Sequence, residues 1–162
     1  MKAFALVRTL VIGPIFLSIW LWWVPRWMGW PMHAVHAEAW IVFGIGMATS
    51  LWCAVEFALR GLGTPAPFDP PRRLVITGLY RFVRNPMYVG LGMALIGEAW
   101  LTGRIEIIYE MLILWIAVTL MVFLQEEPSL RRKFGDDYAE YCRNVGRWIP
   151  RLRPWYASPH LE

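Results

Sequence analysis

Four long apolar runs constrain the fold of this chain more than any other feature of the sequence. They cover residues 3–24, 38–59, 86–101 and 105–124, and the third is the shortest. A helix of about 20 apolar residues crosses the hydrocarbon core of a bilayer. Hydrophobic residues make up 57% of the chain and charged residues 17%, which is too apolar for an ordinary soluble domain. The pattern predicts an all-α integral membrane bundle of four transmembrane helices, or five, followed by short C-terminal cytosolic helices.

A chain of 162 residues has room for a single domain. We expect N-terminal helices in 1–71, a cofactor-binding catalytic half in 72–150 and a tail in 151–162. The first run also resembles a signal peptide, because Lys2 gives it a basic start. The bulky Trp22-Trp23 pair near its end lacks the small-residue cleavage pattern of such peptides, so we interpret the run as a mature helix.

The distribution of basic residues predicts the orientation of the bundle. With four crossings and both termini in the cytosol, every lysine and arginine except Arg26 and Arg104 lies on the cytosolic side. This bias indicates a multi-pass protein whose termini face the cytosol, and the net charge of +4 does not require a nucleic acid as partner.

The second apolar run contains small residues at every fourth position. Gly46, Ser50, Ala54 and Ala58 share one helix face, which favours close helix packing in lipid. Packing is also the preferred interpretation for Gly44, although a Gly-x-Gly segment that admits a ligand is an alternative.

Metal binding is not indicated. His33 and His36 are three residues apart with no third ligand nearby, so we interpret them as loop histidines. Cys53 lies in an apolar run and Cys142 in a charged segment, which argues against a disulfide.

The junction between the proline-rich segment 60–77 and the third run combines charge with a helix start. Asn85 and Pro86 read as an N-cap followed by proline at the first helical position. Free N–H groups at that helix start, together with Arg84 and with Tyr80 one turn earlier, would form an anion-binding corner. A lipid phosphate, or no ligand at all, is the alternative.

Glu126 and Glu127 fall at the expected end of the fourth helix. The helix dipole disfavours carboxylates there, so both need a cation such as Arg84 or a cationic ligand. A short helix should follow from Pro128 and end at Gly135.

The segment after Gly135 predicts one more short helix. Asp136 or Asp137 would cap it, and Tyr138, Tyr141 and Val145 would share one of its faces. That face either packs on the membrane domain or lines the site.

Three ordered elements resemble a known group of enzymes. Residues 84–88 (Arg-Asn-Pro-Met-Tyr), 126–130 (Glu-Glu-Pro-Ser-Leu) and 134–141 are similar to the isoprenylcysteine carboxyl methyltransferases and the phospholipid methyltransferases. The resemblance covers about half of the chain. It implies an integral membrane methyltransferase that uses S-adenosylmethionine and acts on a lipophilic acceptor, an isoprenyl-type carboxylate or a phospholipid amine.

The resemblance also implies the site residues. Arg84 and Glu127 would govern activity, and the expected cofactor-binding residues are Gly78, Tyr80, Arg84, Asn85, Pro86, Tyr88, Glu126, Glu127, Tyr138 and Tyr141. Many carboxyl methyltransferases have His where Asn85 stands, and Asn cannot serve as a base near neutral pH. Two alternatives remain: an NADPH-dependent membrane reductase that resembles sterol reductases, and a non-enzymatic lipid-binding membrane subunit.

Overall fold

The computed structural model describes residue 27 and residues 36–61 and 73–156, and all regular structure in these ranges is helical. The elements are η2 (Ala37–Ala39), α3 (Trp40–Gly61), η3 (Gly78–Arg81), α4 (Pro86–Thr102), α5 (Ile105–Met121), η4 (Val122–Glu126) and α6 (Glu127–Asn144). The predicted first crossing, His33 and most of the proline-rich segment lie outside the described residues. The all-helical fold expected from the sequence is confirmed for the described part.

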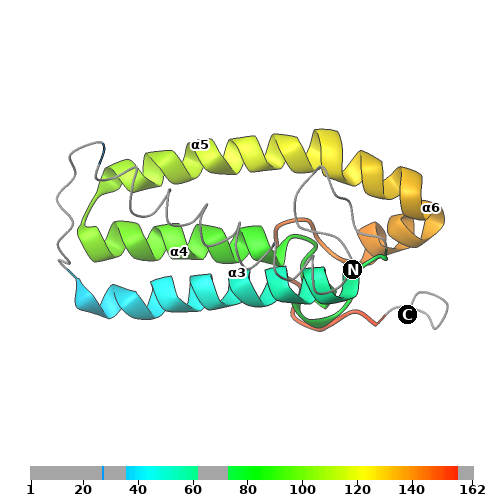
Figure 1. The fold of residues 1–162 in the computed structure, drawn as a ribbon, viewed down its shortest axis with the longest axis horizontal. Helices are drawn as coiled ribbons and strands as arrows, with labels where there is room; N and C mark the ends of the chain where they lie inside the picture. The colour runs from blue at the N-terminus through cyan, green and yellow to red at the C-terminus, as the bar shows by residue number, and fades with distance from the viewer. Residues whose placement is uncertain (1–26, 28–35, 62–72, 157–162) are drawn as a thin grey trace.

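Helix α4 lies between α3 and α5, and the three run side by side (Figure 1). Two helical stretches are long and apolar enough to cross a membrane by length and composition, Ala37–Arg60 and Ile105–Asn144. Their outer faces expose large apolar side chains such as Trp52 and Ile113. An apolar exterior of this kind is expected for helices that face lipid. Helices that face water carry more polar side chains on their outer face.

The predicted small-residue seam brings α3 and α4 into backbone contact. A Cβ atom at Gly46 would lie 2.7 Å from the carbonyl oxygen of Gly90, and one at Gly97 would lie 2.7 Å from Cα of Phe43. The Ser50 hydroxyl is part of the same seam and donates a hydrogen bond to the Met87 carbonyl at 2.9 Å. Packing is therefore confirmed for Gly46. It is wrong for Gly44, because no described residue beyond its own helix turn comes within 4 Å of a Cβ atom placed there.

The boundaries of α4 follow from its sequence. Pro86 occupies the first turn, where a missing N–H has no cost, and Gly103 ends the helix in the left-handed conformation with φ 66°. Helix α5 begins two residues later, close to the predicted start of the fourth apolar run at residue 105.

The expected helix end at Glu126-Glu127 is wrong. The chain continues from α5 through one π-helical turn, η4, directly into α6. Pro128 lies in the first turn of α6. Proline has no N–H to donate to the preceding turn, and a local change from α to π hydrogen bonding accommodates that loss. The dipole argument for a cation near these carboxylates therefore does not hold.

Gly135 interrupts α6 at the predicted position, but the helix kinks there and does not end. Its φ of 51° and ψ of −122° are non-helical, and the helix resumes through Asn144. After this kink Tyr138, Tyr141 and Val145 pack on Ile76, which confirms the shared face. The kink thus turns the end of α6 back toward the chain segment that precedes α4.

Candidate functional site

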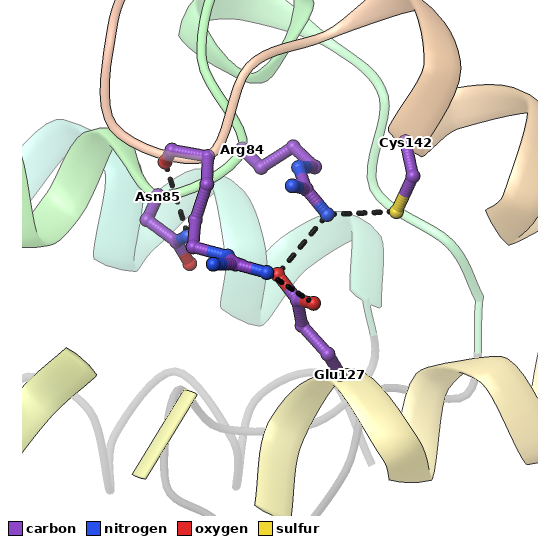
Figure 2. Close-up of polar contacts among 5 residues, drawn as sticks. Arg84, Asn85, Glu127 and Cys142 are labelled. Carbon is purple, nitrogen blue, oxygen red and sulfur yellow. Dashed lines mark hydrogen bonds and ion pairs between the residues drawn. The ribbon is translucent and has the colours of Figure 1, made fainter. Parts of the chain in front are cut away.

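Glu127 lies at the centre of a charge cluster at one end of the bundle. Its side chain is buried, and both of its oxygens are bonded by Arg147, whose Nε lies 2.6 Å from Oε1 and whose Nη2 lies 2.9 Å from Oε2. Arg84 Nη1 lies 3.1 Å from the same Oε1 (Figure 2). Hydrogen bonding to Glu127 raises the pKa of Arg147. The predicted approach of Arg84 to Glu127 is therefore present, with a second guanidinium added.

Glu126 has a different environment from its neighbour. Its Oε1 accepts a hydrogen bond of 2.8 Å from the hydroxyl of Tyr88, which lies two residues into α4 beyond Pro86. No ion pair of Glu126 occurs among the described residues. Adjacent carboxylates thus meet different partners, a pair of arginines for Glu127 and a phenol for Glu126.

Arg84 joins the charge cluster to α6. Its Nη1 donates to the Cys142 sulfur at 2.7 Å, and Figure 2 shows the guanidinium between Glu127 and Cys142. Its buried Nε–H has no hydrogen-bond partner among the described residues. A buried N–H of a cation without an acceptor is costly, so this atom has capacity for a ligand oxygen or a water.

Asn85 does not cap α4 with its side chain, contrary to the prediction. It occupies the N-cap position, but its amide Nδ2 donates 3.2 Å to the carbonyl of Arg147 instead (Figure 2). The backbone of Asn85 has φ −123° and ψ 57°, which is outside the usual extended conformation of a capping residue. Its side chain therefore anchors the C-terminal segment.

A small cavity of about 50 Å³ lies beside the charge cluster. Its lining includes most of the predicted site residues, namely Tyr80, Arg84, Asn85, Glu126, Glu127, Tyr138 and Tyr141. Pockets that hold whole small molecules measure about 300–1,000 Å³, so this cavity accommodates only part of such a ligand.

Tyrosine side chains build the wall of this cavity. The Tyr141 hydroxyl donates to the Tyr80 carbonyl at 2.7 Å, and the Tyr80 hydroxyl donates to the Cys53 carbonyl at 3.4 Å. Burial raises the pKa of the Tyr80 hydroxyl well above its ordinary value, so this phenol stays neutral. These bonds tie η3 to both α3 and α6.

Gly78, Pro86 and Tyr88 do not line the cavity. Gly78 has φ 52°, and a side chain there would collide with the Glu56 carboxylate. Glu56 itself accepts a hydrogen bond of 2.8 Å from the Thr77 hydroxyl and pairs with Arg60. Glycine at position 78 thus has a structural reason independent of any ligand.

Sequence reasoning missed Arg147, Cys142 and Trp148. The Trp148 ring lies 4.7 Å from that of Trp115 and 6.4 Å from that of Tyr88, measured between centroids. The only signal in the sequence was the basic and aromatic Arg-Trp pair directly after Gly146. Among the described residues no group of three or more His, Cys, Asp or Glu side chains could hold a metal ion.

Two carboxylates and the Arg84 guanidinium therefore line one cavity, and Arg147 pairs with one of these carboxylates. Such a cluster complements a ligand that carries both charges, because each sign of charge finds an opposite partner without unpaired burial.

Comparisons with known proteins identify the family of this chain. A profile of the family described as phospholipid methyltransferase matches residues 34–137. Methanethiol S-methyltransferase of Pseudomonas deceptionensis is 31% identical over 134 residues, which cover 78% of this chain and 44% of that protein. Protein-S-isoprenylcysteine O-methyltransferase of Schizosaccharomyces pombe is 35% identical over 80 residues, which cover 49% of this chain and 34% of that protein.

A third relative is phosphatidylethanolamine N-methyltransferase of Talaromyces marneffei, 34% identical over 87 residues, which cover 51% of this chain and 9% of that protein. The chain thus spans less than half the length of these curated relatives. No solved structure matches the chain. Since the family profile covers most of the sequence, including α3 to the kink in α6, the chain belongs to the phospholipid methyltransferase family.

Proposed function

We propose that this protein is an integral membrane methyltransferase that uses S-adenosylmethionine and methylates a lipophilic acceptor. The observation that carries the proposal is the buried cluster of Glu127 with Arg84 and Arg147 beside a cavity. The family membership and the names of the relatives support a methyltransferase rather than the NADPH-dependent reductase or the non-enzymatic lipid-binding subunit.

The residues fit such a methyl donor at its charged end. The unpartnered Nε–H of Arg84 offers a donor to a carboxylate, and Glu126 and Glu127 offer acceptors to an ammonium group. When bound, S-adenosylmethionine supplies an electrophilic methyl group on a sulfonium. The described residues would bind the donor and orient it toward the acceptor. Binding and orientation suffice when the electrophile is already activated.

The relatives suggest the chemistry of the acceptor. Their names refer to a small thiol, an isoprenylated cysteine and a phospholipid amine. The last two of these acceptors carry lipid groups, which favours a lipophilic acceptor for this chain. The exposed apolar faces of α3 and α5 are consistent with entry of an acceptor from the lipid, between helices, while the donor enters from the cytosol.

Isothermal titration with S-adenosylhomocysteine, the demethylated form of the donor, tests this function. The folded protein in detergent or lipid should bind it and should not bind NADPH. Glu127→Ala and Arg84→Ala should each abolish binding while circular dichroism retains the helical signal. Absence of binding to the folded wild-type protein would refute the function. Unchanged affinity in both variants would remove these two residues from the site.

A further inference from the structure

The chain after α6 lies against the segment that carries Arg84 and Asn85. Three backbone hydrogen bonds connect residues 145–156 to residues 81–85: from Arg84 N to the Gly146 carbonyl at 2.9 Å, from Arg151 N to the Phe82 carbonyl at 2.9 Å, and from Trp155 N to the Arg81 carbonyl at 3.0 Å. Backbone bonds of this kind fix one segment relative to the other. The position of residues 145–156 is therefore set by the same loop that carries the predicted site residues.

A tight turn within this segment directs Arg147 toward Glu127. A Cβ atom at Gly146 would lie 2.8 Å from the Ile149 carbonyl oxygen, so the turn is compact and requires glycine there. Arg147 is held at its backbone by Asn85 and at its guanidinium by both oxygens of Glu127. A bidentate contact fixes the carboxylate in both distance and plane.

The next residue reaches the other carboxylate indirectly. Trp148 packs between Trp115 of α5 and Tyr88 of α4, and the Tyr88 hydroxyl bonds Glu126. Trp115 in turn covers Gly92, where a Cβ atom would lie 3.5 Å from its ring. One turn thus holds Glu127 through Arg147 and supports Glu126 through Trp148 and Tyr88.

We propose that the Gly146–Trp148 turn is a positioning element that orients the Glu126-Glu127 pair for the donor. This inference rests on the proposed function, and it extends the site beyond residue 137, where the match to the family profile ends. Arg147 acts through Glu127 and does not need to contact the donor. The turn holds the Glu126 and Glu127 side chains in place before the donor binds. They therefore lose less conformational freedom on binding, which increases the affinity for the donor.

Titration of Arg147→Ala with S-adenosylhomocysteine tests the inference. We expect affinity to fall by about tenfold or more, because Glu127 without its bidentate partner is no longer held in one orientation before the ligand binds. Arg151→Ala is the matched control. It removes the same charge from the same segment, and the Arg151 side chain bonds only the exposed Asn144 carbonyl among the described residues. Its affinity should stay within about twofold of the wild type.

Chemical rescue separates positioning from a general effect on folding. Millimolar ethylguanidinium should fill the space left in Arg147→Ala, pair with Glu127 and restore much of the affinity, with no effect on Arg151→Ala. Should Arg147→Ala fail to fold, Arg147→Lys replaces it. This variant keeps the charge, cannot reproduce the bidentate contact and should bind several-fold more weakly.

The outcomes distinguish this inference from the proposed function. A wild-type protein that does not bind S-adenosylhomocysteine would refute both. A wild-type protein that binds, with Arg147→Ala or Arg147→Lys equal to Arg151→Ala, would refute the inference alone. Weakened binding that ethylguanidinium does not restore would also overturn it, because the loss would then not be due to the missing guanidinium at Glu127.

Discussion

At the scale of single residues, the two adjacent carboxylates are held by different chemistry. Glu127 is 4% exposed and is paired with two arginines, whereas Glu126 is half-buried and accepts a hydrogen bond from a neutral phenol. Two paired guanidiniums satisfy the Glu127 charge, and removal of one partner from a buried pair is costly. Glu126 has no ion-pair partner among the described residues, so its charge remains available to a ligand while the phenol holds it.

Tyr88→Phe tests the role of that phenol. The variant removes the hydroxyl that bonds Glu126 and keeps the ring that packs on Trp148. We expect S-adenosylhomocysteine to bind about two- to tenfold more weakly, since a typical hydrogen bond contributes roughly 0.5–1.5 kcal/mol. Isothermal titration measures this change.

Tyr109→Phe is the control for this prediction. Tyr109 is 60% exposed on α5, so loss of its hydroxyl should leave the affinity unchanged. An affinity of Tyr88→Phe equal to that of the control would show that the phenol does not position Glu126 for the ligand.

Sequence could identify some members of the charge cluster but not all of them. Arg84 and Glu127 stood out because they lie in short motifs beside helix ends. Arg147 belongs to no periodic pattern, and its partner lies 20 residues earlier in the chain. Only the kink at Gly135 and the turn at Gly146 bring the two together, and neither angle can be read from local propensity. The prediction that the Asn85 side chain caps α4 was wrong for a related reason. This side chain bonds the distant Arg147 carbonyl instead of the helix start.

At the scale of elements, the contact between α3 and α4 holds the bundle together. Gly46 faces the backbone of α4 directly, and Gly44, two residues earlier, faces open space. Gly46→Ala should destabilise the protein by about 1–3 kcal/mol, because the added methyl overpacks the seam. Gly44→Ala is the matched control and should be neutral or stabilising by up to about 1 kcal/mol, as expected for alanine within a helix.

Thermal unfolding in detergent, followed by circular dichroism, measures both variants. Equal stability of the two would contradict the seam. A lower unfolding temperature for Gly44→Ala than for Gly46→Ala would show that α3 is rotated relative to the described packing.

The helices themselves were predictable and their continuity was not. Apolar runs bounded by Pro86 and Gly103 gave the limits of α4 to within a residue, because both residues have backbone requirements that act locally. The π-turn between α5 and α6 depends on how Glu126, Pro128 and their neighbours pack. Sequence periodicity does not distinguish a helix that ends before proline from one that absorbs it through a π-turn.

At the scale of the whole molecule, the charge cluster and most of the described basic residues lie at one end of the bundle, and Arg104 lies at the other. Helix α4 begins there, at the residue after Asn85, and ends at the opposite end, at the Gly103 turn before α5 (Figure 1). Arg131, Arg132 and Lys133 are exposed on α6, at the same end as the cluster. This asymmetry supports the proposal that the site faces the cytosol, as the positive-inside rule predicts.

Cysteine labelling in intact cells tests this orientation. Glu106 is exposed in the first turn of α5, near the Gly103 turn, and Arg132 is exposed on α6. A membrane-impermeant maleimide should label Glu106→Cys in intact cells and should label Arg132→Cys only after the membrane is permeabilised. The wild-type chain, whose Cys53 and Cys142 are free thiols, gives the background. Labelling of Arg132→Cys in intact cells, with Glu106→Cys protected, would reverse the orientation and place the donor site outside the compartment in which S-adenosylmethionine is expected.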